Sequence, residues 1–92
     1  MYKVIIIDDE AKPREVLLMK LKEEFPELDI VATADSAVKG YEYCMQLKPD
    51  IVFLDVNMPV NTGFDFLAMF DKVPFEIIFS TAYQQYALEA FK

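Results

Sequence analysis

The chain has 92 residues, enough for one domain with a single hydrophobic core, and 54% of them are hydrophobic, which excludes a disordered composition. The net charge of −7 argues against direct binding of nucleic acid, because phosphate backbones are bound by lysine and arginine. Histidine is absent, so any chemistry must depend on carboxylates, hydroxyls, lysines and the backbone.

The first half of the chain alternates short apolar runs with longer amphipathic stretches. Residues 3–7 predict a strand buried on both faces, and residues 13–24 predict a helix. Residues 29–34 predict a second strand. Asp35 or Ser36 is expected to cap the next helix. The predicted core face of that helix consists of Ala37, Val38, Tyr41 and Met45.

The second half of the chain continues the same alternation. Residues 51–55 and residues 75–80 predict two further strands. A turn at residues 61–63 precedes a predicted helix over residues 64–70, and a last helix is expected to begin near residue 83 or 84. The predicted order of elements is therefore βαβαβαβα.

Strands that alternate with helices favour an α/β fold with one parallel sheet, helices on both faces and right-handed crossovers. In such sheets, ligands bind beyond the carboxyl ends of the strands. The polar residues at those predicted strand ends are Asp8, Asp9, Asp55, Ser80 and Thr81. The sequence therefore predicts a functional site along this edge of the sheet.

The three aspartates at the strand ends are predicted to form a cation site. Two unit charges about 4 Å apart in a partly buried site repel by roughly 4 kcal/mol, and a divalent cation removes that repulsion. Mg²⁺ typically binds one or two carboxylates, a carbonyl oxygen and several waters. Asp8 and Asp9 are the expected holders of the metal, and the backbone carbonyl of Asn57 is a further candidate ligand.

Asp55 is the best candidate nucleophile, because it stands alone at the end of its strand. A carboxylate beside Mg²⁺ can attack a phosphoryl group and form an aspartyl phosphate. Thr81 could then hydrogen-bond an oxygen of that phosphoryl group. The simpler alternative is that each of these residues only caps a following helix, as Asp and Thr often do. Three such acids at neighbouring strand ends favour the functional interpretation.

Three segments of the chain resemble the receiver domain of bacterial two-component response regulators. These are residues 4–10 (VIIIDDE), residues 49–59 (PDIVFLDVNMP) with Gly63, and residues 79–82 (FSTA). They occur in the order of that family and span nearly the whole chain. The resemblance implies one receiver domain over residues 1–92, with a flavodoxin-like, doubly wound parallel sheet, acting as a signalling phosphoacceptor rather than as an enzyme.

The resemblance also implies roles for individual residues. A sensor histidine kinase would phosphorylate Asp55 in a Mg²⁺-dependent step. Asp9, Asp55 and the Asn57 carbonyl would hold the metal, with Asp8 supporting it directly or through water. Thr81 would be the switch hydroxyl. Residues 81–91 are, in addition, similar to receivers that precede a LytTR-type DNA-binding domain, which implies a role in transcription regulation.

The chain departs from the family at its C-terminal end. Receivers have five βα units, whereas four are predicted here, and Lys92 is not expected to be the lysine that ends the family's fifth strand. A fragment of a longer regulator is one interpretation, and a naturally short receiver is the other. The fourth predicted strand, which contains Ile77, Ile78 and Phe79, would then be an edge that favours self-association.

Two alternative functions stay open at this point. A pseudo-receiver would keep the fold and act as an interaction or dimerisation module without being phosphorylated. A phosphohydrolase or phosphotransferase on the haloacid-dehalogenase plan would also use a strand-end aspartate. That plan usually requires a second aspartate two residues after the nucleophile, and Asn57 occupies this position.

The remaining sequence features suggest a cytoplasmic protein. Cys44 is the single cysteine, so no internal disulfide is possible, which fits a reducing compartment. No apolar stretch approaches the roughly 20 residues that span a bilayer, and no signal peptide is expected. No interaction with a membrane is therefore predicted.

Overall fold

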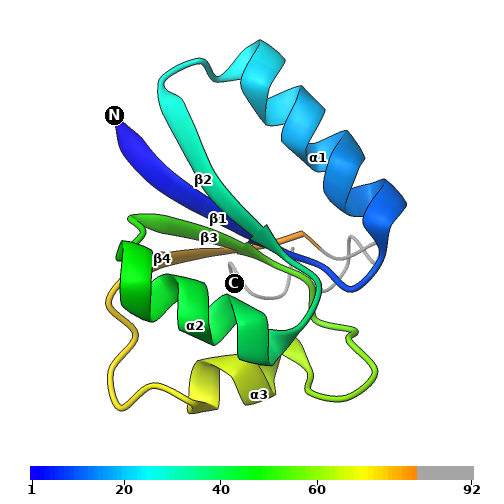
Figure 1. Cartoon of the computed structure of the whole chain (residues 1–92), viewed down its shortest axis with the longest axis vertical. Coiled ribbons are helices and arrows are strands. Elements are labelled where there is room, and N and C mark those ends of the chain that lie inside the picture. Colours follow the sequence, from blue (N-terminus) through cyan, green and yellow to red (C-terminus); the bar gives the residue numbers. More distant parts are fainter. Residues whose placement is uncertain (81–92) are drawn as a thin grey trace, which may run out of the picture.

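The computed structural model describes residues 1–80, which contain one parallel sheet of four strands in the order β2-β1-β3-β4 (Figure 1). Every neighbouring pair of strands is parallel, as the alternation of elements predicts. The strands are β1 (Tyr2–Ile7), β2 (Leu28–Ala34), β3 (Ile51–Leu54) and β4 (Glu76–Phe79). The order changes direction at β1, which places the switch point between β1 and β3.

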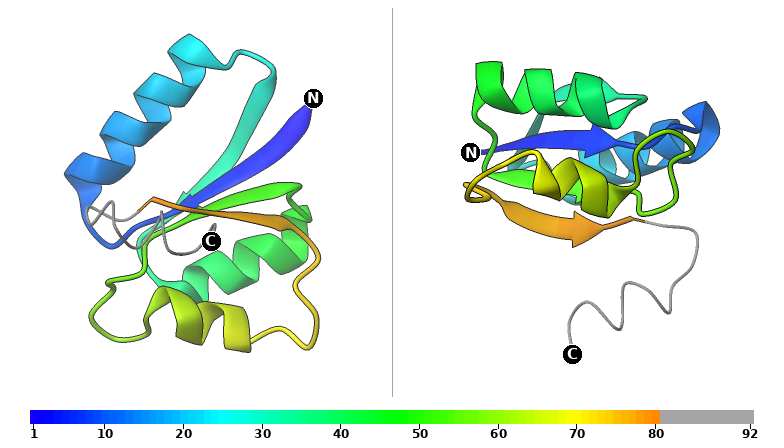
Figure 2. Two further views of the ribbon diagram at one scale, coloured as in Figure 1. Left: turned by 180° about the vertical axis from the view of Figure 1, so that it is seen from behind. Right: turned by 90° about the horizontal axis from the view of Figure 1, so that it is seen from below.

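Helices cover both faces of the sheet. The three helices of the described residues are α1 (Ala11–Glu24), α2 (Ala37–Leu47) and α3 (Gly63–Ala68). Figures 1 and 2 show α1 on one side of the strands and α2 with α3 on the other side. None of these three helices is long and apolar enough to cross a bilayer. The arrangement is the flavodoxin-like, doubly wound fold that the sequence predicts.

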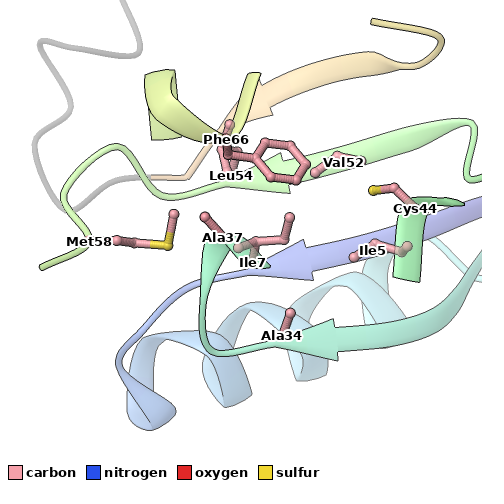
Figure 3. Packing of buried hydrophobic residues seen from close by; sticks show 9 residues of the cluster. All are labelled: Ile5, Ile7, Ala34, Ala37, Cys44, Val52, Leu54, Met58 and Phe66. Atoms are coloured by element: carbon pink, nitrogen blue, oxygen red, sulfur yellow. The ribbon is translucent and has the colours of Figure 1, made fainter. Parts of the chain in front are cut away.

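Each face of the sheet has its own apolar cluster, because successive strand residues point to opposite faces. Val4, Ile6 and Phe53 pack with Leu21 of α1. The alternate residues of the same strands pack under α2 and α3 (Figure 3). The buried members of this second cluster are Ile5, Ile7, Ala34, Ala37, Cys44, Val52, Leu54, Met58 and Phe66. β1 is therefore buried on both faces, as its apolar run predicts.

The strand register aligns the carboxyl ends of β1, β3 and β4. Ile7 pairs with Leu54, and Leu54 pairs with Phe79. The next residues continue this register, because the backbone N–H of Asp55 donates to the Ile7 carbonyl at 2.9 Å and that of Ser80 donates to the Leu54 carbonyl at 2.9 Å. The three strands therefore end level with one another, and the polar residues that follow them start from neighbouring positions.

A capping box begins α3 just beyond this edge. The Thr62 hydroxyl accepts from the backbone N–H of Asp65 at 3.1 Å, and the Asp65 carboxylate accepts from the backbone N–H of Thr62 at 2.9 Å. Gly63 also donates its N–H to the Val56 carbonyl at 3.0 Å. These bonds hold the start of α3 directly against the end of β3.

α2 buries Ala37 and partly buries Tyr41, as predicted, but the two other predicted core residues are exposed. Val38 and Met45 were expected in the core but are 52% and 55% exposed, whereas Gly40 and Cys44 are buried. A Cβ at Gly40 would overlap the Ile7 side chain, so the glycine allows α2 to approach the sheet along this line. The buried face of α2 is therefore the one that lets its backbone approach the sheet closely. It is not the face that carries the largest apolar side chains.

β4 lies at one edge of the sheet in the described part of the chain. Its Glu76 is exposed, and Ile77, Ile78 and Phe79 are half-buried. Self-association through this edge stays a prediction, which light scattering at high protein concentration would test. The predicted last helix, from residue 83 or 84, and Thr81 lie outside the described residues.

Candidate functional site

Three carboxylates meet at the carboxyl ends of β1 and β3. Asp8 and Asp55 are only 6% and 7% exposed, and Asp9 is half-buried. One carboxylate oxygen from each residue lies within 4.8 Å of the corresponding oxygens of the other two. The convergence that the sequence predicts for these aspartates is therefore present in the structure.

Backbone hydrogen bonds fix the two most buried carboxylates. Asp8 Oδ1 accepts from the backbone N–H of Glu10 at 2.9 Å, and Asp55 Oδ1 accepts from that of Asn57 at 3.2 Å. In both cases the donor lies two residues further along the chain, the turn that an aspartate at a strand end commonly forms. Arg14 adds a bond at 2.8 Å from its Nη1 to the Asp8 backbone carbonyl. The loop between β1 and α1 is thus held through both the side chain and the backbone carbonyl of Asp8.

Asp9 contributes a buried oxygen that has no partner. Within residues 1–80, Asp9 Oδ1 is inaccessible to solvent and accepts no hydrogen bond. Buried polar atoms are paired in the large majority of cases, so an unpaired oxygen on a residue of this carboxylate cluster is what a cation-binding site would present. Hard divalent cations such as Mg²⁺ take oxygen ligands of this kind. The donor set therefore fits Mg²⁺.

The acidic cluster changes the titration of Asp55. Burial and, to a smaller extent, the Asp8 charge raise the pKa of Asp55 from 3.8 to about 7. The neighbouring Asp9 and Asp8 carboxyl groups act in the same direction, while the hydrogen bond from the Asn57 N–H lowers the pKa. A nearby cation favours the charged form of a carboxylate. A cation bound at this cluster would therefore lower the pKa of Asp55.

Without metal, Asp55 is expected to destabilise the fold as the pH rises from about 4 to about 7. The unfolded chain loses this proton near pH 4, whereas the folded chain holds it until its raised pKa of about 7. The contribution of Asp55 to the free energy of unfolding is thus greatest below the unfolded pKa. It falls by up to about 1.4 kcal/mol per pH unit through this window. Above about pH 7 both states are ionised and the penalty is constant.

Urea unfolding with a chelator present, at pH 5, 6, 7 and 8, measures this penalty. The stability of Asp55→Asn relative to wild type is expected to increase from pH 5 to 7 and then to level off. Added Mg²⁺ should narrow the gap at pH 8 by stabilising the wild type alone. A gap that does not change with pH would contradict the proposed electrostatic origin.

The structure describes the other predicted site residues only in part. Asn57 follows directly after the acidic cluster and is exposed, and its backbone carbonyl stays a candidate ligand. Thr81 lies outside the described residues. Arg14 is not recognisable as a site residue from the sequence, because its bond to the Asp8 carbonyl depends on the path of the β1–α1 loop.

The comparison with family models agrees with this geometry. The description "response regulator receiver domain" matches residues 4–92. The chain belongs to this family. For this receiver, the fold and the strand-end aspartates therefore agree with the family match. The fold and the acidic cluster are both evident from residues 1–80 alone.

The receiver is similar over its whole length to longer proteins. It is 42% identical to an uncharacterized response regulatory protein of Vibrio cholerae and 42% identical to the sensory transduction protein LytT of Bacillus cereus. Both matches cover 100% of the chain but only 39% and 38% of those two proteins. The chain thus spans well under half the length of these relatives.

The receiver also resembles solved structures. It matches the receiver domain of AraT, a response regulator from Geobacillus stearothermophilus, with a TM-score of 0.80 and 30% identity. The match covers 98% of this chain and 73% of the AraT chain. The fold assigned from the parallel sheet is therefore also the fold of an experimentally determined receiver.

Proposed function

We propose that this receiver accepts a phosphoryl group from a sensor histidine kinase onto Asp55, in a step that requires Mg²⁺. The observation that supports the proposal most directly is the convergence of three carboxylate oxygens within 4.8 Å of one another. The cluster has a raised Asp55 pKa and an unpaired Asp9 oxygen, both of which a bound cation would relieve. The family membership supports the same role.

The two oxygens of Asp55 have different surroundings. Oδ1 accepts the hydrogen bond from the Asn57 N–H, whereas no hydrogen bond to Oδ2 is present among residues 1–80. In the proposed reaction, Oδ2 forms a bond to phosphorus while the phosphorus–nitrogen bond of the kinase phosphohistidine breaks. The leaving imidazole nitrogen keeps the electron pair and takes up a proton. The hydrogen bond at Oδ1 fixes the carboxylate for this attack.

The remaining residues of the cluster hold the metal in this proposal. Asp9 and Asp55 supply carboxylate oxygens, the Asn57 backbone carbonyl supplies another oxygen, and Asp8 supports the ion directly or through water. Mg²⁺, when bound, neutralises the carboxylates and the phosphoryl oxygens. Thr81 is proposed to hydrogen-bond the transferred phosphoryl group and so to act as the switch. The output is a conformational change rather than turnover of a substrate.

The proposal is tested by the intact mass of the protein after incubation with Mg²⁺ and phosphoramidate. The wild type is expected to gain one phosphoryl group, and Asp55→Ala is expected to gain none. Asp71→Ala removes an exposed carboxylate outside the cluster and should behave as the wild type. A chelator should abolish the gain, because the reaction depends on the metal.

The other outcomes are equally informative. An equal mass gain in Asp55→Ala would show that another residue is modified and would contradict the assignment of Asp55. No gain in the wild type, with Mg²⁺ binding retained, would instead favour the non-phosphorylated interaction module.

The output of the longer regulator is a separate proposal. LytT of Bacillus cereus is named a sensory transduction protein, and this chain covers 38% of it. We infer that the receiver acts in a regulator of the LytTR-output class and controls transcription through a region outside this chain. Phosphorylation of Asp55 is proposed to be the signal that such a region receives.

A further inference from the structure

Ser80 contributes the second unpaired buried atom of the described residues. Its Oγ is inaccessible to solvent and has no hydrogen-bond partner within residues 1–80, as is also true of Asp9 Oδ1. A hydroxyl both donates and accepts, so leaving it unpaired in the interior is unfavourable. Both unpaired atoms belong to residues that follow strand ends on the same edge of the sheet. This edge of the sheet therefore carries a buried polar group beyond the three carboxylates.

The register places Ser80 beside Asp55. Leu54 pairs with Phe79, and the N–H of Ser80 donates to the Leu54 carbonyl at 2.9 Å, so the next row across the sheet contains Asp55 and Ser80. Asp8 begins from the same row on the other side of Asp55, because Ile7 pairs with Leu54. Neighbouring strands lie about 4.8 Å apart, which brings a serine side chain within reach of a group attached to Asp55.

The alternation of side chains puts these residues on one face. Phe53 and Ile78, two residues before Asp55 and Ser80, both pack in the cluster on the α1 side of the sheet. Side chains at i and i+2 of a strand point to the same face. The Ser80 hydroxyl is thus directed to the face on which the Asp55 carboxylate starts, and away from the cluster under α2 and α3.

We propose that Ser80 is a further phosphoryl-binding residue of this receiver, whose hydroxyl donates a hydrogen bond to an oxygen of the phosphoryl group on Asp55. The inference rests on the proposed function. A phosphoryl oxygen is a charged acceptor, and hydrogen bonds to charged groups are the stronger ones. An unpaired donor already in place needs little rearrangement to form such a bond.

The proposal predicts opposite effects of Ser80→Ala on stability and on binding. Removing a buried hydroxyl that has no partner should leave stability in urea unchanged or raise it. The same change should weaken the binding of beryllofluoride, a mimic of the aspartyl phosphate, by about tenfold in the presence of Mg²⁺. The affinity for Mg²⁺ alone should stay within about twofold of wild type, because Ser80 is not proposed to hold the metal.

Calorimetric titration of the metal-loaded protein with beryllofluoride measures the first affinity, and titration of the metal-free protein with Mg²⁺ measures the second. Ser80→Thr keeps the hydroxyl and should retain most of the beryllofluoride affinity. Thr33→Val removes a hydroxyl from β2, which is not a neighbour of β3, and should bind beryllofluoride as the wild type does.

Each result decides the proposal. Unchanged beryllofluoride affinity in Ser80→Ala, with a functional wild type, would overturn the role of Ser80 and leave the proposed function intact. A parallel loss of stability and of Mg²⁺ affinity would assign Ser80 a packing role and also overturn it. A wild type that binds Mg²⁺ but neither binds beryllofluoride nor gains a phosphoryl group would refute the proposed function, and the Ser80 inference with it.

Discussion

Replacing Phe66 by alanine is expected to lower the free energy of unfolding by about 3–5 kcal/mol. Within residues 1–80, Phe66 is the largest fully buried side chain, with 0% of its surface exposed. Its ring lies 5.3 Å from that of Phe70 and 6.2 Å from that of Phe75, measured between centroids. The alanine would leave a cavity among residues of α2, α3 and β3, and a packed core closes such cavities only partly.

The cost should be large because Phe66 provides the one fully buried side chain of α3. The helix contains only six residues, and Gly63 and Phe66 are its buried positions. A helix of this length is not stable by itself, so its attachment depends on the side chain that it buries. The beginning of α3 also lies against the end of β3, and the acidic cluster is therefore expected to loosen when Phe66 is removed.

Phe64→Ala is the matched control, since it makes the same chemical change in the same helix. Phe64 is 58% exposed, and its ring contacts Phe79 with centroids 5.7 Å apart. Its replacement should cost about 1 kcal/mol or less. Urea unfolding monitored by circular dichroism compares the two variants. Similar costs for both would show that α3 is not held by the Phe66 pocket.

The strands and the acidic cluster were predictable because their physical signals are local and unambiguous. The run at residues 4–7 is apolar throughout, as expected for a central parallel strand, and it ends at Asp8. The rule that parallel strands share one carboxyl edge then brings Asp8 and Asp55 together without knowledge of any side-chain contact. The structure confirms this convergence, and the chemical roles of the residues stay proposals.

The helix faces were harder to predict because they depend on contacts between elements. Leu17, Leu21 and Phe25 recur at the four-residue spacing of one helix face, yet Leu21 is buried whereas Phe25, at the C-cap of α1, is 44% exposed. Gly40 in α2 has no apolar side chain, so the hydrophobic periodicity does not mark it as a core position, although it faces Ile7. Ser80 was recognised only as a strand-end residue, because an unpaired hydroxyl is a property of the packed structure.

Gly63→Ala is the second change with a large expected effect. A Cβ at Gly63 would lie 2.7 Å from the Asp55 carbonyl oxygen and 3.1 Å from the Val56 Cα. Both are backbone atoms of the segment that leaves β3, so no side-chain rotation can relieve the overlap. The φ angle of Gly63 is not positive, and the constraint is therefore one of space alone. To make room for the Cβ, the backbone at the start of α3 must move away from the segment that leaves β3.

Overpacking of this kind should cost about 2–3 kcal/mol of stability. The affinity for Mg²⁺ should fall by about tenfold as well, because the displaced backbone carries the Asp55 carboxylate, and such supporting contacts are worth 10–100-fold in metal affinity. Urea unfolding without metal measures the first effect, and calorimetric titration with Mg²⁺ measures the second.

Gly40→Ala separates a general packing defect from a displaced site. Its Cβ would meet the Ile7 side chain and, at 3.4 Å, the Phe66 ring, and no backbone atom is among these contacts. The end of the isoleucine can change rotamer, and alanine is the better helix former by about 1 kcal/mol, which offsets part of the strain. Gly40→Ala should therefore lose less stability than Gly63→Ala and keep its Mg²⁺ affinity. If both variants lost Mg²⁺ affinity equally, the contact between Gly63 and Asp55 would not be what positions the site.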